Sequence, residues 1–470
     1  MRAIALLERL RTSVRGAIDA CSDGYIEGWA WDKKTPDIPV RVDILRNGIP
    51  VGTTVAEDYR EDLAAAGIGN GKHAFWFRLP ASVPSDRVQA RVAGTGFELP
   101  CATPKAVPEY RRYSLPQFSG GLWCVEDIGL SASTLRFNGW AFHPPAVASE
   151  LCTFLVNGRP CQAVEFPMPR TDIGRQFPHV RDSEVSGFCC STEILPEDGG
   201  AYELVFGHAL LNRAIREGYN QYFTVDALPL PEAERRERVH GSRHEALFRL
   251  EGFSAYRKLE KALGRVGRTF DDCPRILDWG CGCGRVARYF AGSRSSLYGV
   301  DIDSDNVEWC RRNLPFATFS AIPLHPEPAV PPERFSLIIG FSVFTHLREH
   351  VMLEWLAWLH GMLDPDSGLA MVSLLSDFWW ARNPTLPQDA YDEWRSRGIL
   401  DGRSNSDLDP VLAPKDRSYY RTTFHTHEYL HSKWSTWFDI LEVLPGTIGN
   451  LQDLVIMRPK GGRASARAGL

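Results

Sequence analysis

The sequence predicts two all-β, sandwich-like domains followed by one doubly wound α/β domain. Three observations lead to this prediction. A pattern recurs after about 110 residues in the first half of the chain, a distance that suits tandem domains. Each copy consists of short alternating stretches separated by turns, which is typical of a β-sandwich. In the second half, apolar strands alternate with helical segments, as in a parallel sheet covered by helices.

The composition is that of an ordinary folded protein. The chain has 470 residues, of which 44% are apolar and 24% charged, and its formal net charge is −5. Because there is no basic excess, a nucleic-acid partner is not expected. No stretch of eighteen apolar residues occurs, so no transmembrane segment is expected. The eleven cysteines are scattered and lack metal-binding spacing, which favours reduced thiols in the cytoplasm and no metal site.

The first residues of the chain allow two interpretations. Ala3, Leu7, Leu10 and Val14 follow one another at helical spacing, and arginines lie between them. Residues 1–18 therefore either form a helix on a membrane surface, as a peripheral contact, or pack on their own domain. Charged residues interrupt the apolar ones, so this segment is not a secretory signal.

Three features recur in the two copies: a Gly-Trp-Ala-aromatic stretch, an Asn-Gly pair and an Arg-x-Asp motif. The Asn-Gly pairs predict tight hairpin turns, and each Arg-x-Asp motif predicts a charge-assisted pair that fixes a loop. We expect the two domains to span residues 1–115 and 116–228. The matching pieces are Gly28-Trp29-Ala30-Trp31 and Gly139-Trp140-Ala141-Phe142, Asn47-Gly48 and Asn157-Gly158, and Arg60/Asp62 and Arg170/Asp172.

The tryptophans of these stretches also have two interpretations. Trp29 and Trp140 either stack on sugar rings or belong to the cores of their domains. The repeats resemble the Gly-Trp-Ala-Trp-Asp modules attached to bacterial glycosyltransferases and methyltransferases of surface-polysaccharide clusters. The resemblance rests on residues 28–32, 59–63 and 71–75, and the second copy is degenerate. It implies a glycan context and no chemistry of its own.

A glycine-rich turn follows the first strand of the second half. The strand ends at Asp278, and Gly280, Gly282 and Gly284 come directly after it. Glycines at this spacing let a ligand approach the backbone closely, because no side chain stands in the way. A helix is expected immediately after the turn, over residues 286–290.

An acidic residue ends the next strand. This strand is expected over residues 296–300, and Asp301 follows it. A carboxylate in that place can accept hydrogen bonds from both ribose hydroxyls of a nucleoside. Further strands are expected over residues 335–341 and 369–374. A doubly wound sheet built in this order binds its ligand at the carboxyl ends of the strands.

Residues 250–460 resemble the class I S-adenosylmethionine-dependent methyltransferases, which have a Rossmann-like fold. The resemblance implies S-adenosylmethionine as the cofactor. It also implies roles for particular residues: Asp278, Gly280, Gly282 and Gly284 in the first cofactor motif, Asp301 at the ribose, Ile302 against the adenine, and Phe341 and Ser342 beside the methionine part. Asp453 falls in the family's final antiparallel hairpin, where we interpret it as structural. Many members present an aspartate to the adenine amino group after the third strand, where this chain has Ser320.

Methyl transfer to a hydroxyl benefits from a general base, and the sequence offers several candidates. His346 lies just beyond the fourth strand, and His425 lies in an insertion over residues 376–436 that we expect to cover the substrate. Asp377 and His427 are further candidates, and both His346 and His425 could instead be structural. The tryptophans of the insertion either stack on sugar rings or form its own small core; they are Trp379, Trp380 and Trp394.

These observations predict a methyltransferase domain over residues 229–470. We expect it to O-methylate a saccharide, as part of a bacterial surface glycan or its precursor. Two alternatives stay open: a non-catalytic glycan-binding scaffold with a degenerate methyltransferase domain, or a methyltransferase that acts on a small metabolite or a lipid. The intact Asp278, the three glycines and Asp301 favour an enzyme.

Overall fold

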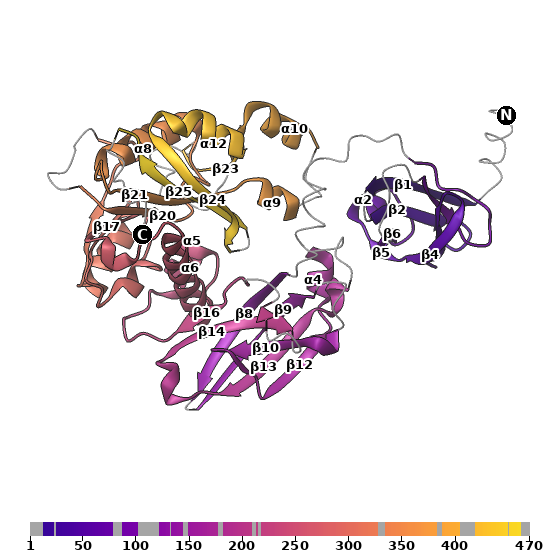
Figure 1. The fold of residues 1–470 in the computed structure, drawn as a ribbon, viewed down its shortest axis with the longest axis horizontal. Coiled ribbons are helices and arrows are strands. Elements are labelled where there is room, and N and C mark those ends of the chain that lie inside the picture. The colour runs from indigo at the N-terminus through magenta and orange to yellow at the C-terminus, as the bar shows by residue number, and fades with distance from the viewer. Residues whose placement is uncertain are drawn as a thin grey trace, which may run out of the picture. The chain divides into compact units, whose positions relative to one another are not determined.

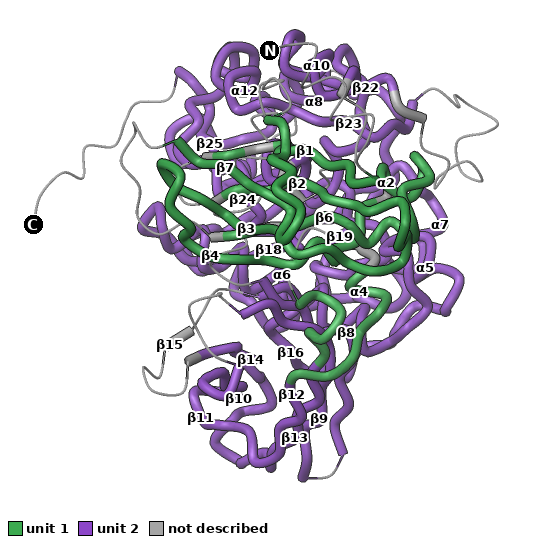
Figure 2. Tube along the Cα trace, turned by 90° about the vertical axis from the view of Figure 1, so that its right-hand side faces the viewer, with its two compact units in different colours: residues 1–115, 167–187 green, residues 116–166, 188–470 purple. Residues whose placement is uncertain are grey.

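The computed structural model divides into two compact units (Figure 2). Unit 1 comprises Met1–Leu115 and Pro167–Gly187, and unit 2 comprises Pro116–Phe166 and Phe188–Leu470. The structure describes residues 13–22, 25–78, 87–101, 122–131, 133–143, 149–176, 182–208, 213–214, 218–327, 334–382, 388–404, 419–449 and 451–461. Within these ranges, no helix has both the length and the apolar character that crossing a bilayer requires.

Unit 1 contains two antiparallel sheets that share one core. Ile26 and Phe75 come from one sheet and Val42 and Ile44 from the other, and all four are buried in the same cluster. The first sheet has the order β1 (Val14–Ser22), β2 (Tyr25–Asp32), β6 (Lys72–Arg78), β5 (Asp58–Tyr59). The second has the order β4 (Ile49–Ala56), β3 (Val40–Arg46), β7 (Val88–Val92). The remaining elements are α2 (Glu61–Ala65), α4 (Thr171–Gln176) and η2 (Ser183–Val185).

Val14 begins strand β1, whereas the sequence placed it on an amphipathic helix. Its side chain is buried in the core of unit 1, so this residue packs on its own unit rather than on a membrane surface. Residues 1–12 of the expected helix lie outside the described residues.

The first part of unit 2, here called the second β region, consists of the described strands between Leu122 and Thr224. Its core is aromatic and includes Trp123, Phe137 and Phe154. One sheet has the order β12 (Ala163–Met168), β13 (Gly187–Glu193), β9 (Thr134–Phe142), β8 (Leu122–Ser131). The other has the order β11 (Arg159–Pro160), β10 (Cys152–Val156), β14 (Ala201–His208), β15 (Arg213–Ala214), with β16 (Tyr222–Thr224) also paired to β14. The short helices η1 (Ser149–Leu151) and η3 (Pro196–Asp198) connect its strands.

A seven-stranded sheet forms the centre of the remainder of unit 2 (Figure 1). Its order is β19 (Thr318–Ala321), β18 (Ser296–Asp301), β17 (Arg275–Trp279), β20 (Leu337–Gly340), β21 (Leu369–Leu374), β25 (Gln452–Pro459), β24 (Phe438–Ile448). Neighbours among the first five strands are parallel, and β25 is antiparallel to both β21 and β24. This order confirms the doubly wound fold and the final antiparallel hairpin.

The same part of unit 2 also contains helices and one insertion. The helices are α5 (Ala233–His240), α6 (Glu245–Arg265), α7 (Ser304–Asn313), α8 (Glu349–Met362) and the short η4 (Phe270–Asp272). The helix expected after the glycine turn is the short 3-10 helix η5 (Ala287–Phe290). The insertion after β21 contains α9 (Asp377–Arg382), α10 (Gln388–Arg397), β22 (Ile399–Ser404), β23 (Arg421–His425), α12 (His427–Lys433) and η6 (Trp434–Thr436).

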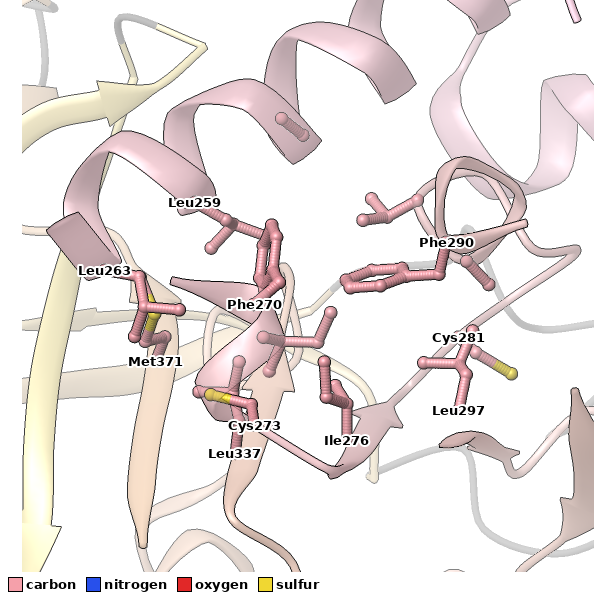
Figure 3. Close-up of a cluster of buried hydrophobic side chains, with 14 of the residues drawn as sticks. Leu259, Leu263, Phe270, Cys273, Ile276, Cys281, Phe290, Leu297, Leu337 and Met371 are labelled. Atoms are coloured by element: carbon pink, nitrogen blue, oxygen red, sulfur yellow. The ribbon is translucent and has the colours of Figure 1, made fainter. Parts of the chain in front are cut away.

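Helix α6 belongs to two cores. Leu259 and Leu263 extend toward Phe270 and the strands of the large sheet, as Figure 3 shows. Leu250, on another side of the same helix, is buried with Trp123 in the core of the second β region. A helix can serve two cores in this way because residues three or four positions apart repeat on each of its sides. The second β region and the large sheet are therefore parts of one compact unit.

Candidate functional site

A pocket opens at the carboxyl ends of β17, β18 and β20, the place where doubly wound sheets bind their ligands. Most of the site residues predicted from sequence line it: Asp278, Gly280, Gly282, Asp301, Ile302, Phe341, Ser342 and His346. Four predicted residues are not among its lining residues: Gly284, Ser320, Asp377 and His425. The structure therefore assembles the expected cofactor residues and separates the candidate bases.

The glycine turn needs glycine for two different reasons. Gly280 and Gly282 line the pocket with φ of 78° and 52°, in the left-handed region that side chains disfavour. A Cβ on Gly280 would lie 2.4 Å from Cγ2 of Val343, which also lines the pocket. Gly284 instead faces α7, where a Cβ would lie 2.4 Å from Cδ1 of Leu314. The first two glycines keep the pocket open, and the third lets the turn pack.

Asp278 has a buried carboxyl group, and one of its oxygens makes no hydrogen bond within the described structure. It is the next-to-last residue of β17, it is 2% exposed, and its Oδ2 has no hydrogen-bond partner among the described residues. Burial, together with the nearby charge of Asp301, raises the pKa of Asp278 to about 7. A buried acceptor without a partner is costly, so this atom is suited to a hydrogen-bond donor from a ligand.

Asp301 holds the turn and faces the same pocket. Its Oδ2 accepts a hydrogen bond from the backbone N–H of Gly282 at 2.7 Å, and its Oδ1 accepts one from Asp303 at 2.8 Å. Burial raises the pKa of Asp301 to about 6, although these backbone hydrogen bonds act to lower it. Each carboxylate oxygen has a second lone pair, so the group can still accept from a ligand.

Ser342 holds an unusual backbone conformation at the end of β20. Its φ is 59°, in the left-handed region, although it is not a glycine. Two interactions keep it there: its N–H donates to Oγ of Ser373 at 2.7 Å, and its Oγ accepts from Nε2 of Gln452 at 2.8 Å. Strained residues held by their surroundings cluster at functional sites. This conformation therefore agrees with the predicted role of Ser342 in the pocket.

Two arginines that the sequence analysis did not single out also line the pocket. Arg238, on α5, pairs with Asp303 at 2.9 Å, and Arg285, after the glycine turn, pairs with Glu251 at 2.8 Å. The guanidinium carbon of Arg285 lies 4.9 Å from the ring centre of Phe341. Arg285 directly follows Gly284 in the sequence, and this position was the available signal. Arg238 lies among several charged residues, and no local pattern distinguishes it.

His346 is the predicted base that lines the pocket. Its Nδ1 lies 3.0 Å from the carbonyl oxygen of Arg421, and its ring stacks on Tyr420 with 4.1 Å between centres. A carbonyl can only accept, so Nδ1 carries the proton and Nε2 holds the lone pair of the neutral ring. The ring is thus held in the tautomer that can receive a proton at Nε2.

Residues 249–409 match a family model described as a methyltransferase domain. The match supports S-adenosylmethionine as the cofactor of this region. No curated protein sequence matches the chain.

Several solved structures are similar to part of this chain. A protein of Pyrococcus horikoshii OT3 has 14% identity and a TM-score of 0.30, over 44% of this chain and 91% of its own. The glycopeptide N-methyltransferase MtfA has 16% identity and a TM-score of 0.30, over 44% of this chain and 90% of its own. The magnesium protoporphyrin IX methyltransferase ChlM of Synechocystis PCC 6803 has 15% identity and a TM-score of 0.31, over 48% of this chain and 92% of its own.

His425 lies in the interior of unit 2. It is 0% exposed, its Nε2 is 3.1 Å from Sδ of Met352, and its ring is 5.8 Å from Trp434. Burial lowers its pKa to about 3, so the ring stays neutral near pH 7. This apolar setting differs from the substrate-facing position that the sequence predicted.

Asp377 belongs to a second group of charged residues in unit 2, and it begins α9 shortly after the end of β21. Its carboxylate is 3.3 Å from Arg395, and burial raises its pKa. In the same group, Nε2 of His427 lies 2.7 Å from Oδ2 of the fully buried Asp453. Asp453 also accepts from the N–H of Gly446 at 2.8 Å, which gives it the structural surroundings expected from the sequence.

Ser320, which stands where the resemblance implies an acidic residue, is exposed on the edge strand β19. It pairs with Val300 of β18. Ile322, two residues further, lines the pocket instead. This side of the pocket therefore offers an apolar surface.

The tryptophans of the insertion form a small core. Trp380 and Trp394 are fully buried and stack with 5.2 Å between their ring centres, and Trp379 packs on Phe424 at 4.6 Å. Of the two interpretations left open by the sequence, Trp380 and Trp394 therefore follow the second, in which they form a small core. The insertion reaches the pocket through Tyr419 and Tyr420, which line it.

Proposed function

We propose that this chain is an S-adenosylmethionine-dependent methyltransferase that transfers a methyl group to a hydroxyl of a saccharide. The observation that carries the proposal is the pocket, in which a glycine turn, two carboxylates and the imidazole of His346 lie together. The turn and the carboxylates suit a nucleoside with a charged tail. The imidazole suits an acceptor group whose proton must be removed.

The pocket offers a partner for each polar part of the cofactor. Asp301 can accept from the ribose hydroxyls, Oδ2 of Asp278 can accept from an ammonium group, and the guanidinium of Arg285 can donate to a carboxylate. Ile302 and Ile322 supply apolar surface for the adenine. When bound, S-adenosylmethionine supplies an electrophilic methyl carbon on its sulfonium.

His346 is the residue that we propose as the general base. A sugar hydroxyl is too weakly acidic to ionise at neutral pH, so its proton must leave while the new oxygen–carbon bond forms. The hydrogen bond to Arg421 leaves the lone pair on Nε2, and the stacking on Tyr420 fixes the plane of the ring. In the proposed transfer, the proton of the acceptor would pass to Nε2 while its oxygen takes the methyl group. The carbon–sulfur bond would break in the same step, with its electron pair left on sulfur, so that S-adenosylhomocysteine is the second product.

The saccharide part of the proposal rests on the N-terminal residues. We propose that residues 1–115 and 116–228 are related modules with a glycan-associated role, followed by the methyltransferase domain at 229–470. Two similarities support their relation. Both Asn-Gly pairs adopt left-handed turns, with φ of 52° and 80° in one copy and 49° and 77° in the other. Both Arg-x-Asp motifs form two-point ion pairs, with shortest distances of 2.6 Å and 2.7 Å.

The tryptophans differ between the two copies. Trp140 is 4% exposed, and its ring centre lies 4.8 Å from that of Phe142, so little of its surface is accessible to a sugar ring. Trp29 is half-buried. Of the two, Trp29 is therefore the better candidate for a sugar-stacking contact.

Two measurements test the proposed function in sequence. Calorimetric titration with S-adenosylhomocysteine tests the cofactor site, and we expect saturable binding. The full chain is then incubated with S-adenosylmethionine and with separate pools of surface glycans, nucleotide-activated sugars, lipids and small metabolites, and mass spectrometry detects added methyl groups. A methylated sugar supports the proposal. Methylation confined to the lipid or metabolite pool contradicts the saccharide part of it and identifies a lipid or a small metabolite as the acceptor. Glycan binding without cofactor binding identifies a scaffold.

A further inference from the structure

Helix α5 borders the pocket and reaches it through two residues. Arg238 and Val239 both line the pocket. Val239 lies close to the glycine turn, because a Cβ on Gly282 would come within 3.0 Å of its Cγ1. Asp301 and Ile302, the proposed contacts of the ribose and the adenine, line the same pocket. The helix therefore borders the end of the pocket that is proposed to hold the nucleoside.

Two arginines, three residues apart on α5, attach this helix to the beginning of α7. Nη1 of Arg235 donates to Oδ1 of Asn306 at 3.0 Å, and Nη2 of Arg238 lies 2.9 Å from Oδ2 of Asp303. The two acceptors are joined as well, because Nδ2 of Asn306 donates to the same Asp303 oxygen at 2.9 Å. The N–H of Asp303 donates to Oδ1 of Asp301 at 2.8 Å, so these contacts lie next to the proposed ribose site. We call the contacts of Arg235 and Arg238 with Asn306 and Asp303 the α5 clip.

The remaining contacts of α5 are mostly polar. Of its eight residues, all of which the structure describes, Arg236 is buried and the others are partly or fully exposed. The Arg236 guanidinium donates to the carbonyls of Pro231 and Arg243, one on each side of the helix in the sequence, and so holds α5 and its two connections together. Nδ1 of His240 lies 3.5 Å from Oε2 of Glu251 on α6. An element held mainly by polar contacts that water can reach opens at a small cost in free energy.

We propose that α5 is a strap at the nucleoside end of the cofactor pocket, and that the α5 clip opens each time the cofactor enters or leaves. The inference rests on the proposed function, in which the pocket binds S-adenosylmethionine and releases S-adenosylhomocysteine. With the clip closed, Arg238 and Val239 stand beside the nucleoside. With the clip open, α5 moves away and the pocket is accessible. The clip thus controls the rate of cofactor exchange, as gating elements of other enzymes do.

The experiment measures both rate constants of S-adenosylhomocysteine binding. Surface plasmon resonance on the full chain gives association and dissociation, and calorimetry gives the dissociation constant. The test variant is Arg235→Met, because Arg235 belongs to the clip but is not among the residues that line the pocket. The matched control is Arg243→Met, which removes the same charge just after α5. The Arg243 side chain is 57% exposed and pairs with Glu237 at 2.8 Å, away from the clip.

We expect Arg235→Met to raise both the association and the dissociation rate constant by about threefold to tenfold, the size of one net hydrogen bond. Both rise because the open strap becomes more populated in the free protein and in the complex. The dissociation constant should therefore change by less than about threefold. Arg243→Met should change neither rate. A faster dissociation with unchanged association would mean that Arg235 stabilises the complex instead of gating it, and would overturn the inference.

The same data separate this inference from the proposed function. If the wild type does not bind S-adenosylhomocysteine, the proposed function fails, and the inference fails with it. If the wild type and Arg243→Met bind alike and Arg235→Met leaves the association rate constant unchanged, the cofactor site stands and the strap alone is refuted.

Discussion

Asp278→Asn should stabilise the unliganded protein at pH 8 and weaken cofactor binding at the same time. In the folded protein the pKa of Asp278 is about 7, compared with 3.8 for a free aspartate. A folded pKa above the unfolded one means that the folded state binds the proton more tightly. The stability of the wild type is therefore lost as the pH rises from 3.8 through 7, by about 4 kcal/mol in total.

About 2.5 kcal/mol of this loss falls between pH 5 and pH 8, where the rest of the protein can be studied conveniently. An asparagine has nearly the same shape and does not ionise, so its variant lacks this part of the pH dependence. The free energy of unfolding of Asp278→Asn, minus that of the wild type, should rise by about 2.5 kcal/mol between these two pH values. Any constant cost of the buried amide cancels in this comparison.

Urea unfolding at pH 5, 6, 7 and 8 without ligand measures the difference, with the analysis confined to the transition that S-adenosylhomocysteine shifts. Asp364→Asn is the matched control. Burial acts to raise the pKa of Asp364, but hydrogen bonds from Ser367 hold it below its usual value, so this carboxyl is ionised throughout the range. Its difference from the wild type should stay constant with pH. A constant difference for Asp278→Asn as well would refute the electrostatic account of this residue, and so would an affinity for S-adenosylhomocysteine that does not fall by about tenfold or more.

Two further predictions concern the base and the domain boundary. His346→Gln should lower kcat by about 10²- to 10⁴-fold and leave the dissociation constant of S-adenosylhomocysteine within about twofold, since a base acts only in the chemical step; His425→Gln should instead lower the free energy of unfolding, because it replaces a packed aromatic ring by an amide whose donors and acceptor find no partners in an apolar site. Residues 116–470 should give a soluble protein that binds S-adenosylhomocysteine, whereas residues 229–470 should aggregate because they expose Leu250 and leave Arg288 without its partner Asp226; comparable binding and solubility of the shorter fragment would contradict this.

The local elements of the site could be predicted from the sequence because short segments determine them. The turn from Asp278 through Gly284 needs left-handed backbone, which glycine supplies, and the apolar strands before and after it identify its place in the sheet. The doubly wound parallel sheet was predicted from the same alternation of strands and helices. Such information lies within about thirty residues of sequence, the length of one strand–helix–strand unit.

The candidate bases show what the sequence could not decide. His346 and His425 both lie beside aromatic residues, and each follows a strand or ends one. Only the tertiary structure distinguishes them. The His346 ring lies beside a backbone carbonyl at the pocket, whereas the His425 ring lies beside Met352 and Trp434. The same holds for α6, whose apolar spacing is equally compatible with one buried side or two. The position of Arg285 depends on Glu251, thirty-four residues earlier.

The charged residues of the pocket predict that a bound ligand stabilises the folded protein. Asp278 and Asp301 are buried near each other, and each loses hydration without a fully compensating partner, which raises both pKa values. Arg238 and Arg285 also line the pocket, but each is already paired, with Asp303 and with Glu251. A ligand that brings hydroxyl and ammonium donors to the two carboxylates and a carboxylate to Arg285 relieves the repulsion that the unliganded fold retains. Binding should therefore strengthen as the pH rises from 5 to 8, because an ionised carboxylate accepts a hydrogen bond from a charged donor more strongly than a protonated carboxyl group does, and the part of this increase that comes from Asp278 should be lost in Asp278→Asn.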